Sequence, residues 1–413
     1  MHSRAAIQRR TLRVLAAAQV LSGCAFFLGI AVAALLARDV SGQEALSGVP
    51  LAFGVVTASL VAAPLSSWMA RAGRRPGLAA GHLIAGLGSA VVVAAAAAGS
   101  FALLCAGMAA FGIGNASNLL ARYAATDLAP AERRARAISV VLLATAAGAI
   151  LGPNLVAQTE PLGEWLGVSD SAAPFSVSVV LYVLAASTLL ILLRPDPLLS
   201  ARRLDGVAPS AGTGAFHALK TLPSWPPLAL TGVAAMAIGN IAMVSVMTMT
   251  PVHMEAAGES LSAVGIVISL HVAGMYLPSP VTGVLADRYG RLPVLAAGGA
   301  LLIAAGVCSA LAPGDHTPLV AVALVLLGIG WNFGLVGGSA LITDAVAVEQ
   351  RPQTQGAADL VMGLTGAVGS LAAGPLFHAG AFGLLGVGAA TLGLMLIVVA
   401  SRARGQIAAA TAS

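Results

Sequence analysis

Two pairs of soft donor residues could do chemistry in this chain: Met243-x3-Met247 and, 28 residues further on, His271-x3-Met275. A step of four residues on an α-helix places two side chains on one face, about 6 Å apart along the axis. Thioether sulfur and imidazole nitrogen are neutral donors, and together they suit Cu(I) better than Mg²⁺, Ca²⁺ or an organic anion. Because both pairs lie in apolar segments, the patterns indicate a copper path through a membrane.

Methionine is concentrated around these patterns. Six of the 11 methionines lie between residues 236 and 275: Met236, Met243, Met247, Met249, Met254 and Met275. A methionine stripe in an apolar helix is usually packing material, because methionine fills irregular gaps. His271 favours metal binding, because among the seven histidines it is the one near the middle of an apolar span, where polar groups are costly. A structural histidine bonded to a backbone carbonyl is the alternative.

The four donors are expected to lie at successive depths. Counted as helical rise from the outer ends, Met247 is shallowest, Met243 follows, and His271 and Met275 are deeper. This order predicts a ladder of exchangeable sites, with Met243 and His271 as the central ligands. Three further donors near the outer mouth are candidates for a relay onto the ladder: Met249, His253 and Met254.

The composition is that of an integral membrane protein. Of 413 residues, 58% are hydrophobic and 9% are charged, and the mean hydropathy is +0.92, whereas soluble chains carry about 25% charged residues. The basic residues are not gathered on one segment, so we expect no nucleic-acid partner. Three scattered cysteines give no disulfide framework. A metalloprotease motif and a recognisable nucleophile are absent, so we expect no enzyme.

Twelve apolar segments are long enough to cross a bilayer, which takes about 20 residues. They are 12–37, 46–69, 76–98, 101–126, 135–157, 173–194, 227–252, 261–286, 292–312, 317–343, 354–377 and 380–401. The polar stretch at 195–226 predicts a linker between two bundles. We therefore expect an all-α membrane protein with an N-terminal six-helix bundle at 1–194, a cytoplasmic linker at 195–226 and a C-terminal six-helix bundle at 227–413.

The distribution of basic residues sets the expected orientation. With both termini in the cytoplasm, 20 of the 21 lysines and arginines lie on the inner side, and only Arg38 lies outside. Positive charge is retained on the cytoplasmic side of membrane proteins. The sequence therefore predicts a multi-pass protein with both termini cytoplasmic.

The two halves repeat each other. Arg71-x-Gly73-Arg74 recurs as Arg288-x-Gly290-Arg291, and Thr126-Asp127 recurs as Thr343-Asp344, both at an offset of 217 residues. Several matches at one offset indicate duplication of a six-helix unit. An even number of helices in each copy makes the copies parallel, related by a pseudo-two-fold axis along the membrane normal.

This arrangement resembles the major facilitator superfamily over nearly the whole chain. The family's loop signature G-x3-D-R-x-G-R is intact in the second half, as Gly283, Asp287, Arg288, Gly290 and Arg291. In the first half only Arg71, Gly73 and Arg74 match, and the usual glycine and aspartate are replaced by Ser66 and Ala70. The resemblance implies that these loops form a conformational gate. It should be weaker in the first copy unless Asp127 or another carboxylate substitutes.

At the soft donors the chain resembles a narrower branch, the CcoA-like copper importers. Their marks are M-x3-M on the seventh helix and H-x3-M on the eighth, matched here by Met243, Met247, His271 and Met275. The resemblance implies copper uptake across the bacterial inner membrane to supply assembly of a cbb3-type cytochrome c oxidase. Copper is then the transported substrate and no cofactor is expected. The expected partners are the copper ion, the lipid bilayer and a copper chaperone, and we expect a monomer.

Other polar residues leave alternatives open. Asp359, inside the eleventh span, is a candidate proton-coupling carboxylate or an inner-gate hydrogen-bond partner. Uncharged polar residues within the spans include Gln19, Asn115, Asn118, Asn154, Asn240 and Asn332. They would line a cavity for an organic solute such as riboflavin, or join helices by hydrogen bonds, which we prefer for most of them. A membrane copper receptor that binds without transport is a third hypothesis.

Overall fold

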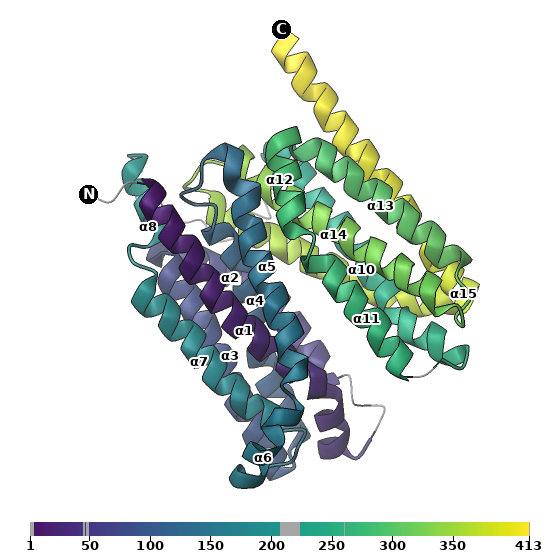
Figure 1. Ribbon diagram of the computed structural model, residues 1–413. Helices are drawn as coiled ribbons and strands as arrows, with labels where there is room; N and C mark the ends of the chain where they lie inside the picture. Colours follow the sequence, from purple (N-terminus) through teal and green to yellow (C-terminus); the bar gives the residue numbers. More distant parts are fainter. Residues whose placement is uncertain (1–3, 44–45, 47–48, 207–223, 260, 413) are drawn as a thin grey trace. The chain divides into compact units, whose positions relative to one another are not determined.

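The computed structural model describes residues 4–43, 46, 49–206, 224–259 and 261–412 (Figure 1). Regular secondary structure in these ranges is entirely helical, and twelve stretches within them are long and apolar enough to span a membrane. The predicted all-α fold with twelve transmembrane helices is therefore confirmed. Residues 207–223 of the expected linker lie outside the described residues.

Up to Leu204, the first half of the chain contains six candidate membrane spans and several short connecting helices. The helices are α1 (Arg4–Ser41), α2 (Val49–Ala72), α3 (Arg74–Ala98), α4 (Phe101–Ala124), η2 (Ala131–Arg133), α5 (Arg134–Asn154), η3 (Ala157–Thr159), α6 (Glu160–Leu166), α7 (Ala173–Leu192) and α8 (Pro197–Leu204). The second half contains α10 (Pro227–Ala256), α11 (Leu261–Tyr276), α12 (Ser279–Tyr289), α13 (Arg291–Leu311), α14 (Thr317–Ala345) and α15 (Arg351–Ala412).

Three details of the helices were not predicted from the sequence. The single span predicted at 261–286 is two helices, α11 and α12, which are separated at Leu277 and Pro278. Prolines at 278 and 280 lack the N–H that would continue the helical ladder. The last two spans lie in one continuous helix, α15, with no loop between them. The expected linker begins with an ordered helix, α8, capped by the Asp196 side chain.

The chain forms two compact units. Unit 1 comprises Met1–Ala129, Val140–Leu219 and Val348–Leu360, and unit 2 comprises Pro130–Ser139, Lys220–Ala347 and Val361–Ser413. The start of α5 therefore belongs to unit 2, and the start of α15 belongs to unit 1. The predicted bundle boundaries follow chain order and do not include this exchange of segments.

Each unit is built around a buried helix interface. In unit 1, aromatic residues of α4 and α7 fill the core, with Phe111 packed edge-on against Phe175 and Tyr182. In unit 2, α10, α11 and α13 all pack against α14, which is buried along most of its length from Val320 to Thr343. Small residues allow the close approach: a Cβ at Gly328 of α14 would lie 2.9 Å from the backbone nitrogen of Met275.

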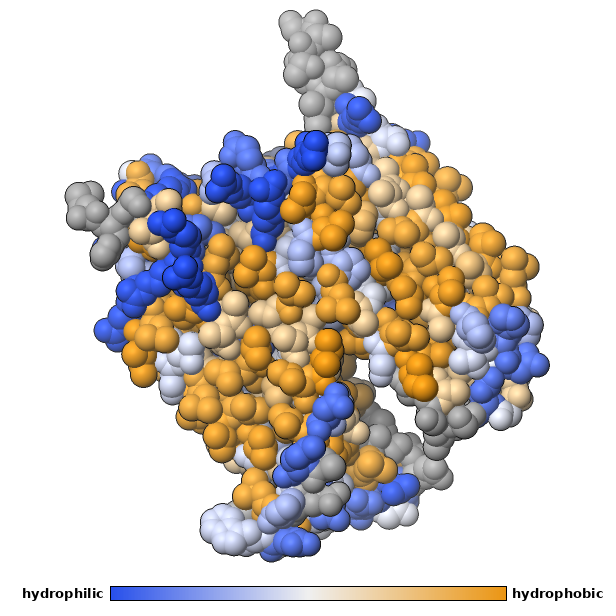
Figure 2. Space-filling model, viewed as in Figure 1, coloured by the Kyte–Doolittle hydropathy of each residue, from blue (hydrophilic) through white to orange (hydrophobic). Residues whose placement is uncertain are grey.

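Hydrophobic side chains cover much of the face shown in Figure 2. The exposed fraction reaches 64% at Leu87, 64% at Ile191 and 78% at Leu371. Such an apolar exterior is what a helical protein presents to lipid, since lipid tails require no polar surface.

Candidate metal path and gate

The soft donors lie on two helices that share one neighbour. The helices α10 and α11 pack extensively on α14 and only slightly on each other. Asn240 of α10 accepts a hydrogen bond from the Trp331 indole N–H of α14 (3.1 Å), and Asn332 of α14 donates to the Met275 carbonyl of α11 (2.7 Å). These bonds fix the rotation of α10 and α11 about their axes relative to α14.

His271 is completely buried in unit 2, and its ring is held by one hydrogen bond. Nδ1 lies 2.7 Å from the Leu324 carbonyl oxygen of α14. A carbonyl can only accept, so Nδ1 carries the proton and Nε2 of the neutral ring presents its lone pair. In the described part of the chain Nε2 has no hydrogen-bond partner. The carbonyl contact is the one expected of a structural histidine. The lone pair on Nε2 leaves the ring able to bind a metal as well, because metal-ligating histidines also donate their other ring N–H to a carbonyl.

The methionines differ in burial. Met243 and Met275 are 7% and 8% exposed, while Met247 is half-buried. Met275 lies one turn from His271 on α11, and Met247 lies one turn from Met243 on α10, as the spacing predicts. Among the described residues no group of three or more His, Cys, Asp or Glu is placed to hold a metal ion. A metal path in unit 2 would therefore depend on thioether donors.

The candidate relay residues are engaged in packing. Met254 is completely buried and Met249 is half-buried. His253 places Nε2 3.0 Å from the Ala312 carbonyl oxygen, and its ring stacks on Phe382 with centroids 4.3 Å apart. These contacts give His253 a structural role at the end of α10. The relay itself stays a prediction.

A second histidine is buried within a span, nearer to its start. His82 of α3 is 1% exposed. Its ring stacks on Tyr182 of α7 with centroids 6.0 Å apart, and its Nδ1 has no partner in the described residues. His82 lacks the neighbouring methionines of His271. It therefore offers a matched control for burial of a histidine.

Most of the uncharged polar residues join helices. In unit 1, Gln19 of α1 donates to Thr145 Oγ1 of α5 (2.8 Å), and Asn118 of α4 accepts from Ser22 of α1 (2.6 Å). In unit 2, Asn332 accepts from Thr282 and donates to Ser279. Asn154 is exposed and bonds within its own helix, and Asn115 borders a small cavity in unit 1. Interhelical bonding thus accounts for four of the six: Gln19, Asn118, Asn240 and Asn332.

The intact loop signature in unit 2 places its aspartate at a helix start. The buried Asp287 carboxylate accepts the backbone N–H groups of Ala135 (3.2 Å) and Arg136 (3.0 Å), at the N-terminus of α5. This position favours negative charge, because the first N–H groups of a helix are unsatisfied. Gly283 lies against the same turn of α5, where a Cβ would be 3.0 Å from the Ala135 carbonyl. Arg291 lies 3.3 Å from Asp287.

The two arginines of this signature, Arg288 and Arg291, differ in exposure and in their contacts. Arg291 Nε donates to Asp344 (2.9 Å), and Arg134 donates to the other oxygen of the same carboxylate (2.6 Å). Gly290 has φ +94°, a conformation that favours glycine. Arg288 is exposed and lies over the Tyr289 ring. Only Arg291 therefore belongs to the buried part of the loop.

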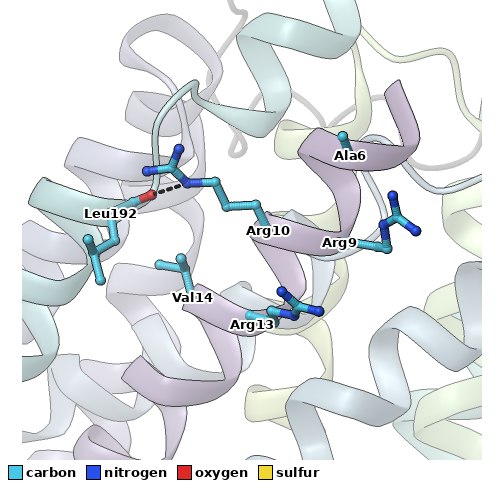
Figure 3. A pocket seen from close by; sticks show the side chains of 6 residues that line it. All are labelled: Ala6, Arg9, Arg10, Arg13, Val14 and Leu192. Carbon is cyan, nitrogen blue, oxygen red and sulfur yellow. Dashed lines mark hydrogen bonds between the residues drawn. The ribbon is translucent and has the colours of Figure 1, made fainter. Parts of the chain in front are cut away.

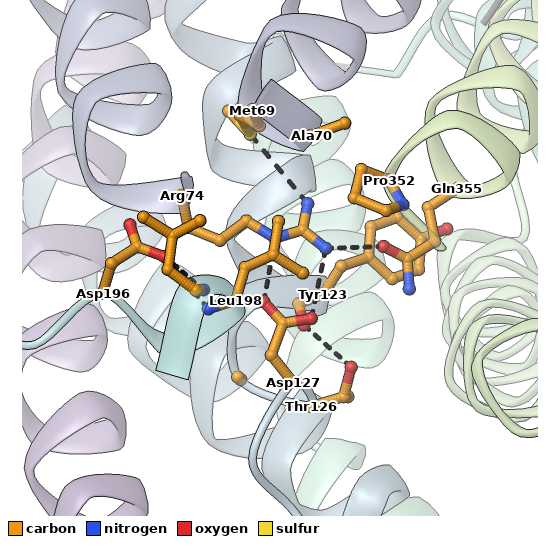
Figure 4. A network of polar contacts seen from close by, with 12 residues as sticks. Met69, Ala70, Arg74, Tyr123, Thr126, Asp127, Asp196, Leu198, Pro352 and Gln355 are labelled. Carbon is orange, nitrogen blue, oxygen red and sulfur yellow. Dashed lines mark hydrogen bonds and ion pairs between the residues drawn. The ribbon is translucent and has the colours of Figure 1, made fainter. Parts of the chain in front are cut away.

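The first copy of the loop is closed by a buried ion pair in unit 1 (Figure 4). Arg74 is completely buried and donates to both oxygens of Asp127 (2.9 and 3.3 Å) and to Gln355 Oε1 (2.8 Å). Arg74 and Asp127 are the repeat counterparts of Arg291 and Asp344, so the same ion pair is present in both halves. Arg71 is exposed, like its counterpart Arg288.

A second carboxylate supports this loop from α8. Asp196 accepts the backbone N–H of Arg75 at the start of α3 (2.7 Å) and those of Leu198 and Leu199 at the start of α8 (3.0 and 3.1 Å). One side chain thus caps two helices. Gly73, with φ +98°, has no room for a side chain, because a Cβ would lie 2.5 Å from Asp196 Oδ2.

An arginine binds the backbone at the position of the aspartate that is missing from the first copy. At Ala70, the counterpart of Asp287, the backbone carbonyl accepts a hydrogen bond from Arg202 of α8 (2.6 Å). The same guanidinium donates to the Glu349 carbonyl (3.3 Å), just before α15. Arg202 therefore joins the end of α2 to the approach of α15 within unit 1.

Asp359 forms an ion pair that its sequence pattern does not indicate. Its carboxylate forms a buried ion pair with Arg122 of α4, and the Tyr123 hydroxyl donates to the same oxygen (3.3 Å). Its other oxygen, Oδ2, has no partner in the described residues. All three residues lie in unit 1. Arg122 was identifiable from the sequence as a charged residue inside the predicted 101–126 span, whereas Asp196 and Arg202 lay in the expected linker and gave no signal.

Comparison with known proteins identifies the family. The model of the family described as "Major Facilitator Superfamily" matches residues 15–275 and 232–412 of this chain. The chain belongs to the major facilitator superfamily. The major facilitator YddS of Bacillus subtilis (strain 168), described as an uncharacterized MFS-type transporter, is 41% identical over 399 residues, which are 95% of this chain and 90% of YddS.

A second relative of this major facilitator carries a substrate in its name. The riboflavin transporter RfnT of Brucella anthropi is 30% identical over 370 residues, which are 90% of this chain and 89% of RfnT. Among solved structures, the human organic anion transporter MFSD10 aligns with a TM-score of 0.74 at 17% identity, covering 95% of this chain and 99% of MFSD10. A bacterial homologue of ferroportin in an outward-facing state also reaches 0.74, at 13% identity, with 96% and 98% covered.

These comparisons define the class of protein. The structural similarities show the fold, and the relatives place the chain among multi-pass membrane transporters. This family carries solutes and is not a family of enzymes.

Proposed function

We propose that this major facilitator imports copper, as Cu(I), along the donors of α10 and α11. The observation that carries the proposal is the state of His271, whose Nδ1 is committed to a carbonyl while Nε2 is buried and without a partner among the described residues. An unmade hydrogen bond on a buried polar atom costs about 1–3 kcal/mol. His82 also has a ring nitrogen without a partner among the described residues, but only His271 has a methionine one turn away on its own helix.

The donor chemistry suits a transported ion. Met243, Met247 and Met275 supply thioethers and His271 supplies an imidazole, so a bound Cu(I) keeps only its single charge. Weak neutral donors at successive depths permit exchange of the ion between partial ligand sets. Met249, His253 and Met254 are proposed to relay copper at the outer mouth, with His253 available only through Nδ1 because its Nε2 faces a carbonyl.

We propose that the loop contacts form the cytoplasmic gate. Asp287 with the α5 start, and Arg74 with Asp127 and Gln355, tie the beginnings of α5 and α15 to their compact units. Opening towards the cytoplasm would require these bonds to break. This assignment takes the orientation from the arginine distribution, with both termini cytoplasmic in the bacterial inner membrane. Supply of a cbb3-type oxidase through a copper chaperone is part of the same proposal.

A second candidate function is facilitated transport of an organic solute such as riboflavin. The relative RfnT, named for riboflavin, supports it over 90% of this chain. The polar residues offer it less support, because most of the intramembrane Asn and Gln side chains are used in interhelical bonds. It would not need the paired methionines or His271.

Uptake by purified protein in liposomes distinguishes these functions. We expect Cu(I) accumulation to fall at least tenfold in Met243→Leu and in His271→Ala. Met395→Leu removes an exposed methionine (53%) and His82→Ala removes a buried histidine of unit 1, and both should retain uptake. Unchanged copper uptake in the first two variants would contradict the proposal. Riboflavin uptake that survives all four substitutions would support the second candidate, and stoichiometric copper binding without uptake would indicate a receptor.

A further inference from the structure

Three arginines gather beside a cavity at the start of α1. Arg9, Arg10 and Arg13 line a space of about 580 Å³ together with Ala6 and Val14 of the same helix and Leu192 at the end of α7 (Figure 3). The cavity lies entirely within unit 1 and is separate from the proposed copper donors, which lie in unit 2. It combines a cationic rim with an apolar wall.

The arginines are available to a ligand. All three are exposed, and in the described part of the chain none forms an ion pair with a carboxylate. Arg10 uses only Nε, which donates to the Leu192 carbonyl (3.2 Å), so its terminal nitrogens remain directed outward (Figure 3). Spacings of three and four residues place these side chains on one side of the helix. A guanidinium fork matches two oxygens of one phosphate.

The cavity lies at the boundary between headgroups and hydrocarbon. Arg13 is the last charged residue before the apolar run Leu15–Leu36. At 1.5 Å per residue this run is about 33 Å long, close to the thickness of a bilayer core. The arginines therefore stand at headgroup depth, and the side chains below them face lipid tails.

An apolar surface continues from the cavity along α7. Leu192, which lines the cavity, is 45% exposed, and Ile191, Leu184 and Val180 further along are 64%, 48% and 56% exposed. Figure 2 shows hydrophilic residues over the start of α1 and hydrophobic residues on the helices beyond it. A ligand with an anionic head and an apolar tail fits both parts.

We propose that this cavity binds the phosphate headgroup of an anionic phospholipid such as phosphatidylglycerol, with an acyl chain along the exposed face of α7. Positive charge alone would satisfy the orientation rule without a cavity. The pocket, the three arginines that line it and the exposed apolar residues of α7 together define a lipid site. Basic pockets at the ends of transmembrane helices bind such headgroups. A free phosphate would gain nothing from the apolar wall.

Native mass spectrometry of the full chain, loaded with phosphatidylglycerol or phosphatidylcholine, tests this site. We expect the triple variant Arg9→Gln, Arg10→Gln, Arg13→Gln to lose at least tenfold of its preference for phosphatidylglycerol. The control triple Arg203→Gln, Arg402→Gln, Arg404→Gln removes the same charge from exposed positions elsewhere and should keep that preference. If the first triple fails to insert, Arg10→Gln and Arg13→Gln are tested singly, and each should lose at least threefold.

Two results would overturn the proposal. Equal loss in the two triple variants, or no loss in the single variants, would show that overall charge and not this cavity selects the lipid. Displacement of phosphatidylglycerol by inorganic phosphate or glycerol 3-phosphate at equal concentration would show a site for a free anion.

Discussion

The ion pair between Arg74 and Asp127 is completely buried in unit 1. Arg74 and Asp127 are both completely inaccessible to solvent, and the arginine satisfies both carboxylate oxygens. In such surroundings a charge without a partner is far more costly than the pair is favourable. The repeat counterparts in unit 2, Arg291 and Asp344, are 11% and 26% exposed and therefore partly solvated.

This difference predicts unequal effects of the same substitution. Asp127→Asn should lower the free energy of unfolding by about 3 kcal/mol, because it leaves the Arg74 charge buried and incompletely paired. Asp344→Asn is the matched control and should cost about 1 kcal/mol or less, because water screens its site. Denaturant or thermal unfolding in detergent micelles measures both. Equal losses would contradict the assigned burial.

At the scale of single residues, sequence patterns pointed to the residues of the site but not to the groups with which they form ion pairs and hydrogen bonds. The repeat at 217 residues singled out Arg74 and Asp127 without pairing them, and the spacing of four residues singled out the donor pairs on α10 and α11. The Arg122–Asp359 pair joins residues 237 positions apart, and no local pattern reports such a contact. The carbonyl that orients His271 is equally invisible, since backbone groups carry no sequence signal.

At the scale of the helices, both units contain a close contact between a glycine on one helix and a serine on another, with the two residue types exchanged between the helices. In unit 2, Gly283 of α12 faces Ser139 of α5, and in unit 1, Ser66 of α2 faces Gly356 of α15. These positions are counterparts at the 217-residue offset. The Ser66 hydroxyl donates to the Pro352 carbonyl, which is the counterpart of the Ala135 carbonyl. Each contact thus consists of one serine and one glycine. The serine lies on α2 in unit 1, but in unit 2 it lies on α5 and not on α12, the counterpart of α2.

The exchange predicts a rescue. Gly283→Ser alone should cost about 1–3 kcal/mol of unfolding free energy, because its side chain would overlap Ser139. Adding Ser139→Gly should restore most of that loss, since the new serine can donate to Ala135 as Ser66 does to Pro352. Unfolding of the single and double variants in detergent measures the difference. No recovery in the double variant would show that the contact needs glycine at position 283.

Helix positions were predicted well, and their interruptions less so. Hydropathy identifies a span because twenty apolar residues are needed to cross lipid. It does not report the break between α11 and α12, which comes from Pro278 and Pro280, nor the short helix α8. The role of α8 depends on Asp196 and Arg202, whose partners on α2 and α3 are remote in sequence.

For the whole molecule, the exchanged segments are the most informative feature. The start of α15, up to Leu360, packs in unit 1, whereas the remainder of that helix belongs to unit 2. Asp359 lies at this junction and is paired with Arg122 and Tyr123 of α4. A transport step that moved the start of α15 would have to separate this ion pair. Protonation of Asp359 would lower the cost of separation, because it removes the negative charge.

Proton coupling through Asp359 is therefore testable. In liposomes with an imposed proton gradient, wild-type copper uptake should be stimulated, whereas Asp359→Asn should show uptake that no longer responds to the gradient. Asp344→Asn, a carboxylate of unit 2 that is partly exposed, should respond like the wild type. Full stimulation of Asp359→Asn, or none in the wild type, would contradict coupling at this residue.

X-ray absorption at the copper edge tests the central claim most directly. Purified protein loaded with one equivalent of Cu(I) should show sulfur neighbours together with an imidazole nitrogen. His271→Ala should remove the nitrogen and Met243→Leu should reduce the sulfur, while His82→Ala leaves the spectrum unchanged. A spectrum with only oxygen or nitrogen neighbours, or one that neither donor substitution alters, would contradict copper binding by α10 and α11.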